Sequence, residues 1–169
     1  MKKRHAILLC GFLRNYEEYI ESFKKNNRNR DDVDLFICFW DQINAHPKPT
    51  KLHKEYEDLN FVNEQKLKDE YNPTVMKIFC WSDYYDLIKP MCELIQVSGL
   101  VGPGGLYNAK SNKTVERTVG ASFLVKEAFK QLEIYQQKNN IKYVNVLRTR
   151  TEFGQYDVGG YYPKIDWDR

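Results

Sequence analysis

Four short apolar runs alternate with helix-forming segments along this sequence. The runs cover residues 6–11, 34–41, 74–81 and 141–150. A short apolar run bounded by polar residues or glycine is typical of a strand, and the continuous first two runs are typical of strands buried on both faces. Strands that alternate with helices pair in parallel, and the connecting helices cover the sheet. The alternation therefore predicts an α/β fold, a mostly parallel sheet with helices on both faces.

The segment 114–138 has the strongest helical pattern in the chain. Its apolar residues recur at spacings of three and four, at Ala121, Leu124, Ala128, Leu132 and Tyr135. This spacing places them on one face of a helix, which would pack against the sheet. Shorter helices are expected over about 16–25, over 61–71, where an Asn-Pro pair follows, and over about 82–90.

Length and composition indicate one globular domain. The chain has 169 residues, enough for a single core and too few for two. Its apolar content of 42% argues against a disordered chain. The formal net charge is +3, and the basic residues are spread along the chain. We therefore expect a single domain over 1–169 that handles small anionic ligands and has no nucleic acid as a partner.

The N-terminus and the cysteines favour a cytoplasmic protein. The basic residues 1–5 precede an apolar run, 6–10, that is too short for a signal peptide or a membrane span. The four cysteines are Cys10, Cys38, Cys80 and Cys92, and no pair has C-x-x-C spacing. We predict that they are reduced and act as small apolar side chains.

Charged residues gather where the last and the second expected strands end. The run 143–147 leads into Arg148, Arg150 and Glu152. Alternate residues of a strand point the same way, so these three would share a face. The second run ends at Asp41. Open α/β sheets bind ligands at the carboxyl ends of their strands, so these side chains form a candidate ligand site, although an ordinary strand end has the same pattern.

The first expected strand ends at Gly11, and Arg14 follows just before a helical pattern. A strand that passes through glycine into a helix presents backbone N–H groups and the helix dipole to a phosphate. The sequence has no G-x-G-x-x-G at this place, so the dinucleotide fingerprint is absent. Gly11 and Arg14 are candidates for contact with a nucleotide phosphate, and a surface position explains Arg14 equally well.

Three blocks of the sequence resemble glycosyltransferase-like proteins of large DNA viruses and of microbial capsule or surface-glycan clusters. The blocks are 11–16 with the Ser-Phe pair at 22–23, then 34–41, then 143–152. The family pattern is a strand ending in G-x-x-R, a strand D-x-F-x-x-x-W-D, and a long helix leading into a strand that ends R-T-R-x-D. The resemblance spans residues 6–153.

The resemblance implies a GT-A fold, a nucleotide-sugar donor and a glycan or protein acceptor, in the host cytoplasm if the chain is viral. It implies contact with the donor's nucleotide or phosphates at Gly11, Arg14, Asp41, Arg148 and Arg150. It further implies a divalent metal, Mn²⁺ or Mg²⁺, held after the fourth strand, because the departing nucleoside diphosphate carries charge that a cation stabilises. Arginines can supply part of that stabilisation.

Two departures from the family pattern affect these expectations. Glu152 stands where the family has aspartate, and it remains the first candidate metal ligand; an Asp-x-Asp at Asp166 and Asp168 is the second. GT-A enzymes continue with an acceptor-binding half, whereas this sequence stops at Arg169. We therefore expect a compact version or a partial protein, and the residues do not single out a catalytic base.

Three functions compete on the sequence alone. The first is a metal-assisted glycosyltransferase. The second is a non-catalytic module, derived from such an enzyme, that binds a nucleotide sugar or a glycan. The third is an unrelated nucleotide-binding α/β enzyme such as a sulfotransferase or a kinase. The lack of a Gly-Lys-Ser/Thr loop counts against a kinase. No Ser-His-Asp or Cys-His spacing supports a hydrolase.

Overall fold

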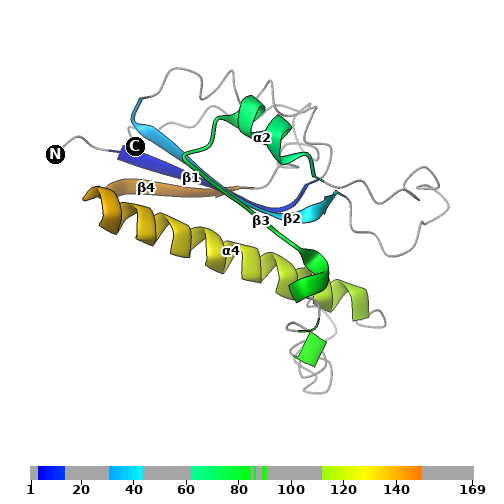
Figure 1. Ribbon diagram of the computed structural model, residues 1–169. Coiled ribbons are helices and arrows are strands. Elements are labelled where there is room, and N and C mark those ends of the chain that lie inside the picture. The colour runs from blue at the N-terminus through cyan, green and yellow to red at the C-terminus, as the bar shows by residue number, and fades with distance from the viewer. Residues whose placement is uncertain are drawn as a thin grey trace, which may run out of the picture.

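A computed structural model describes residues 4–13, 31–43, 62–84, 86, 89–90 and 112–149, and the structural statements that follow concern these residues. They form a sheet of four parallel strands in the order β3-β2-β1-β4 (Figure 1). The strands are β1 (Arg4–Leu13), β2 (Val33–Ile43), β3 (Val75–Phe79) and β4 (Tyr143–Thr149). The expected α/β fold with a parallel sheet is confirmed at this level.

Two helices cover opposite faces of the sheet (Figure 1). Helix α2 (Glu64–Tyr71) inserts Leu67 and Tyr71 into a core cluster on one face, and α4 (Asn112–Asn139) contributes to a second cluster on the other. Residues of β1 alternate between the two clusters, as expected for a strand covered on both sides. Residues 5–11 of β1 and 34–40 of β2 are buried, which confirms the interpretation of the two continuous apolar runs.

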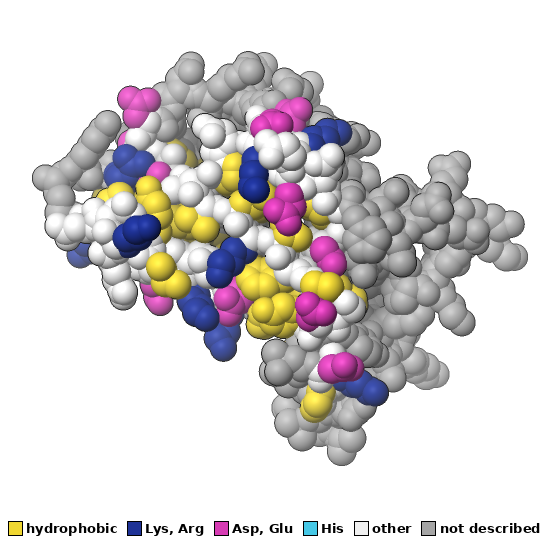
Figure 2. All heavy atoms as spheres, viewed as in Figure 1, with side chains coloured by type: hydrophobic (Ala, Val, Ile, Leu, Met, Phe, Trp, Pro, Cys, Tyr) yellow, Lys and Arg dark blue, Asp and Glu magenta, His cyan; other side chains and the backbone are white. Residues whose placement is uncertain are grey.

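Helix α4 bears out the apolar stripe that the sequence predicts. Leu124, Ala128 and Leu132 are 0 to 5% exposed and pack against β1 and β2. Ala121 and Tyr135 are half-buried at the sides of the stripe. Helix α4 therefore packs on the sheet through one apolar face. On the side of the molecule that Figure 2 presents, lysine, arginine and acidic side chains are mixed over the surface.

The ends of α2 follow local sequence signals. Asn63 precedes the helix, and its side chain accepts a hydrogen bond of 3.0 Å from the backbone N–H of Lys66. Asn72 ends it in the left-handed conformation, with φ 45°, and donates its backbone N–H to the carbonyl of Lys68. The predicted helix over 61–71 is confirmed with a start three residues later.

Strand β4 is less buried than the two central strands. It lies at the border of the sheet that the described residues form, and its residues alternate between buried or half-buried and exposed. Val144 is 54% exposed and Val146 is 41% exposed. Val146 pairs with Ala6, whose side chain faces α4, so Val146 lies on the α4 side of the sheet. An apolar run does not reveal whether its strand has neighbours on both sides, so the sequence did not distinguish β4 from a central strand.

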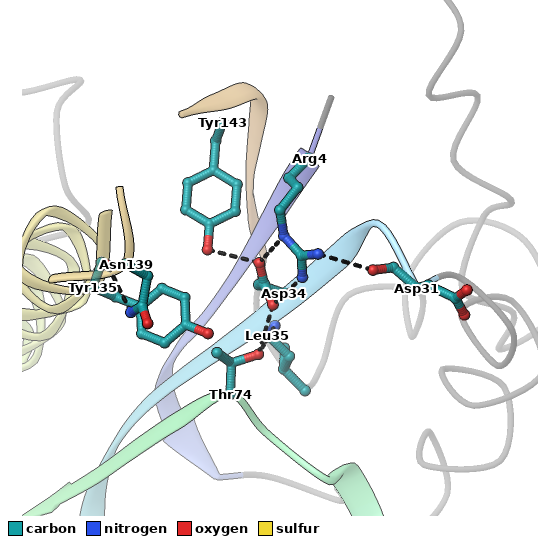
Figure 3. Close-up of polar contacts among 8 residues, drawn as sticks. All are labelled: Arg4, Asp31, Asp34, Leu35, Thr74, Tyr135, Asn139 and Tyr143. Atoms are coloured by element: carbon teal, nitrogen blue, oxygen red, sulfur yellow. Dashed lines mark hydrogen bonds and ion pairs between the residues drawn. The ribbon is translucent and has the colours of Figure 1, made fainter. Parts of the chain in front are cut away.

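The amino ends of the strands are joined through one carboxylate, Asp34 of β2 (Figure 3). Arg4 of β1 donates to both of its oxygens, from Nη2 to Oδ1 at 2.6 Å and from Nε to Oδ2 at 2.8 Å. Tyr143 of β4 donates to Oδ2 at 2.8 Å, and Thr74, just before β3, donates to Oδ1 at 3.2 Å. We call these four residues the Asp34 cluster; it links the amino ends of all four strands.

The hydrogen bonds of this cluster keep the buried carboxylate charged. Burial acts to raise the pKa of Asp34, but the hydrogen bonds from Arg4 and Tyr143 and the charge of Arg4 outweigh it, and the pKa lies below its usual range. The same contact raises the pKa of Arg4. Burial and the hydrogen bond to Asp34 raise the pKa of Tyr143 well above its ordinary value. Asp34 is therefore an ion that the fold stabilises, not a proton carrier near neutral pH.

We predict that Asp34→Asn lowers the free energy of unfolding by about 3 kcal/mol, because it removes the negative charge of a largely buried ion pair and replaces one of the two acceptor oxygens, which bind Arg4 and Tyr143, with an N–H donor group. Urea unfolding measures the difference. Asp31→Asn is the matched control: Asp31 is exposed and meets Arg4 through its backbone carbonyl, which the substitution keeps. Equal losses in the two variants would contradict the role of the cluster.

The lowered pKa of Asp34 makes this contribution depend on pH. A carboxylate whose pKa is lower in the folded than in the unfolded chain contributes stability above its unfolded pKa and loses it as the pH falls through the folded pKa. The gap in unfolding free energy between the natural chain and Asp34→Asn should therefore be constant from neutral pH to about pH 5 and shrink below about pH 4. Urea unfolding at successive pH values measures the gap; one that widens towards acid pH would show the opposite sign of shift.

Candidate functional site

The strand order places a topological switch point between β1 and β4. From β1 the chain proceeds to β2 and then β3 on one side, and later returns to the other side of β1 to form β4. In open parallel sheets, the crevice for a ligand opens at the carboxyl ends of the two strands where the order reverses. The carboxyl ends of β1 and β4 are therefore the first place to look for a site.

Gly11 lies near this edge, in the last part of β1. Its φ of 140° is in the range that side chains rarely adopt, and the pairing of β1 with β2 shifts register between Gly11 and Leu13. The expectation that glycine stops the first strand is wrong, because Gly11 accommodates this irregularity and the strand continues to Leu13. Gly11 thus bends the strand at the edge where a ligand would approach.

Asp41 lies at the carboxyl end of β2 and has two structural contacts. Its Oδ1 accepts a hydrogen bond of 3.0 Å from the backbone N–H of Trp81, at the start of a helical turn over 81–84. Its backbone carbonyl accepts from the N–H of Val62 at 2.8 Å. Asp41 therefore holds two later segments against the end of β2. The side chain is half-buried, and its second carboxylate oxygen has no hydrogen bond to any residue that the structure describes.

Arg148 occupies the exposed face of β4, one residue before the strand ends. It pairs in register with Leu8, which is three residues before Gly11, a distance of about 10 Å along the strand. Leu8 faces α4, so Arg148 also points to that side of the sheet. The structure brings Arg148 to the strand beside β1, as the sequence predicts, but short of the edge.

Several predicted site residues lie outside the described residues. They are Arg14, Arg150, Glu152, Asp166 and Asp168. Within the described ranges, no group of three or more histidine, cysteine, aspartate or glutamate side chains could hold a metal ion. The expected metal thus depends on Glu152, or on Asp166 and Asp168, and stays a prediction.

The sequence analysis missed an aromatic cluster beside Asp41. It consists of Trp40, Phe79, Trp81, Tyr84 and Phe123. Trp40 is fully buried at its centre, 4.8 Å from Trp81 between ring centroids in an edge-to-face contact and stacked on Phe123 at 5.7 Å. The signal was present in the sequence, since two of the expected strands end in tryptophan. The cluster fixes the ends of β2 and β3 and, through Trp81, the carboxylate of Asp41.

The cysteines of the described residues are free thiols, as predicted. Cys10 and Cys38 pair in register on neighbouring strands and are buried under α4, and Cys80 is half-buried. Burial raises the pKa of the Cys38 thiol to about 12, so it stays protonated at neutral pH. Cys10 and Cys38 therefore act as core side chains, and Cys92 lies outside the described residues.

The chain matches no protein-family model, no curated protein and no solved structure. The resemblance to glycosyltransferase-like proteins therefore rests on the sequence blocks described above and stays a prediction. Among the helices that the structure describes, none is both long and apolar enough to cross a membrane.

Gly120 of α4 offers a test of the aromatic cluster. A Cβ at this position would lie 2.7 Å from Cζ3 and 3.1 Å from Cη2 of Trp81. We predict that Gly120→Ala lowers the free energy of unfolding by about 1 kcal/mol, because an overpacking cost of about 1–3 kcal/mol is offset in part by the roughly 1 kcal/mol by which alanine favours a helix. Thermal and urea unfolding measure the effect.

The double variant Gly120→Ala with Trp81→Leu is the control for this prediction, since the smaller side chain leaves room for the methyl group. In the Trp81→Leu background, Gly120→Ala should be neutral or stabilising. A stabilising effect of Gly120→Ala with Trp81 in place would show that the ring moves away at little cost.

Proposed function

We propose that this chain binds a nucleotide sugar at the carboxyl edge of its sheet, between β1 and β4, and acts as a glycosyltransferase of GT-A type. The observation that carries the proposal is the all-parallel order β3-β2-β1-β4. In this order the end of β4, from which the chain runs on to Arg150 and Glu152, is adjacent to the end of β1 with Gly11. The order is the one that dinucleotide- and nucleotide-binding sheets have at their ligand crevice.

The proposed donor lies across the ends of three strands. Gly11 allows close approach of the backbone of β1 to the donor phosphates. Asp41, held by Trp81, accepts hydrogen bonds from ribose hydroxyls or from a base N–H through its second oxygen. Arg148 and Arg150 supply positive charge for the diphosphate, and Arg14, three residues after Gly11 in the sequence, adds to it.

The chemistry of sugar transfer explains why arginines and a metal would be needed at this edge. When the bond between the sugar and the diphosphate breaks, negative charge grows on the leaving diphosphate. Arginines stabilise that charge in part, and a divalent metal at Glu152 supplies the rest. A metal is therefore part of the proposal, with Asp166 and Asp168 as its alternative ligands.

We predict that UDP- or GDP-sugars raise the melting temperature of the chain and that Mn²⁺ increases the shift. Glu152→Ala should abolish the increase that Mn²⁺ brings and keep the metal-independent part, because the arginines remain. Glu133→Ala, at an exposed position on α4, removes the same charge far from the edge and is the matched control. Thermal-shift measurements with nucleoside diphosphates and their sugars, with and without Mn²⁺, test these expectations.

Three outcomes would change the proposal. An unaltered metal response in Glu152→Ala would place the ion at Asp166 and Asp168. Absence of any shift with nucleoside diphosphates or their sugars would contradict nucleotide binding itself. Stabilisation without hydrolysis of the donor or transfer from it would favour the non-catalytic module derived from such an enzyme.

A further inference from the structure

Two cysteines lie side by side on the central strands of the sheet. Cys10 of β1 and Cys38 of β2 are partners in the parallel register of these strands. Both belong to the core cluster that α4 covers, so their side chains point to the same face of the sheet. Each residue is 1% exposed, and both are free thiols. The proposed nucleotide site uses neither of them.

The spacing of parallel strands brings the two cysteines within reach of a disulfide bond. Paired residues on neighbouring strands have Cα atoms about 4.8 Å apart, which is inside the range of about 4.4–6.8 Å found across disulfides. The Cβ atoms of such a pair are also about one strand spacing apart, whereas a relaxed disulfide holds them at about 3.8 Å. A bond between Cys10 and Cys38 therefore requires a small approach of the two strands, and the resulting strain makes the bond easier to reduce.

The backbone that follows Cys10 is suited to this approach. Gly11 has a φ of 140°, and the pairing of β1 with β2 shifts register between Gly11 and Leu13. An irregular step of this kind interrupts the ladder of hydrogen bonds between two strands. Before the pair, by contrast, the register is regular from His5 to Cys10. The strand can therefore adjust on the side of Gly11 when the two sulfur atoms are joined.

We propose that Cys10 and Cys38 form a reversible disulfide with hydrogen peroxide as the oxidant, and that this bond makes the end of β1 redox-sensitive. One thiolate attacks the peroxide, the O–O bond breaks, and a sulfenic acid and hydroxide form. The second thiol attacks the sulfenic sulfur, and water leaves as the S–S bond forms. The hydroxide takes up the proton of the first thiol. Two thiols and one peroxide thus give one disulfide and two waters, with the sulfurs oxidised and the peroxide oxygens reduced.

Helix α4 controls access to the pair. Both side chains are buried beneath it, and burial raises the pKa of the Cys38 thiol to about 12. Cysteines that react quickly are exposed thiolates, so the pair is protected while α4 is in place. Reaction requires a transient opening of the helix, as local unfolding provides. We therefore expect slow oxidation at a rate that follows the opening of α4.

Mass spectrometry of the folded chain tests the proposal. Cys80→Ala and Cys92→Ala are introduced together, which leaves the pair as the only thiols of the sequence. After treatment with hydrogen peroxide, we expect a monomer that is lighter by two hydrogen atoms and has no thiol open to alkylation in urea. Reduced glutathione should restore both thiols, since a strained disulfide is readily reduced. With Cys38→Ala added as the control, Cys10 should gain oxygen or stay unchanged.

Two variants of α4 test the path of access. Leu132 is 5% exposed and belongs to the same core cluster as the cysteines, whereas Ile134 is 48% exposed. Leu132→Ala weakens the packing of α4, so the disulfide should form about tenfold faster at a temperature where the chain stays folded. Ile134→Ala shortens an exposed side chain of the same helix and should leave the rate unchanged. Equal rates in the two variants would contradict access through the opening of α4.

A thermal-shift measurement links the bond to the nucleotide site, and this step alone rests on the proposed function. Cys10 directly precedes Gly11, where the donor phosphates are proposed to approach. A nucleoside diphosphate should therefore raise the melting temperature less in the oxidised chain than in the reduced chain. Equal shifts would contradict the redox sensitivity of the strand end. Absence of a shift in both states would contradict the proposed function and not the disulfide, which is measured without nucleotide.

Three outcomes of the peroxide treatment would overturn the inference. Thiols that stay unmodified in the folded chain would show that the pair is an inert part of the core. Oxygen on both sulfurs without loss of hydrogen would show that the two side chains do not reach each other. A disulfide-linked dimer would show that the thiols react between chains and not within one.

Discussion

The ion pair between Asp34 and Arg4 is the contact on which the rest of the sheet depends. A carboxylate that is 5% exposed is tolerable only if its charge is matched and its oxygens accept hydrogen bonds. Here the donors come from β1, from β4 and from the residue before β3, so satisfying Asp34 requires all four strands to begin at one level. The apolar clusters on the two faces supply most of the burial, and the Asp34 cluster adds hydrogen bonds that a shift of register between the strands would break.

Fixing the amino ends also fixes what meets at the carboxyl ends. With the strands parallel and in register, Gly11 lies opposite Phe39, and Asp41 extends beyond it at the end of β2. The polar groups at the amino edge are thus tied to one another, whereas Asp41 at the carboxyl edge of β2 is held by two later segments of the chain. The N–H of Trp81 orients one oxygen of its carboxylate.

The fold was predictable from the sequence because it depends on local patterns. Four apolar runs and a stripe on one long helix give the parallel sheet and its covering helices. The Asp34 cluster was not predictable, because its other members lie 30 to 109 residues from Asp34 in the sequence and each looks like an ordinary strand-end residue. The position of β4 was not predictable for a related reason: the run from Tyr143 to Leu147 is as apolar as a central strand, and only the strand order shows that β4 is at the border of the sheet that the described residues form. The candidate site could be predicted only as the carboxyl edge of the sheet. The sequence did not show that Arg148 lies short of that edge, because its position depends on the register of β4 with β1.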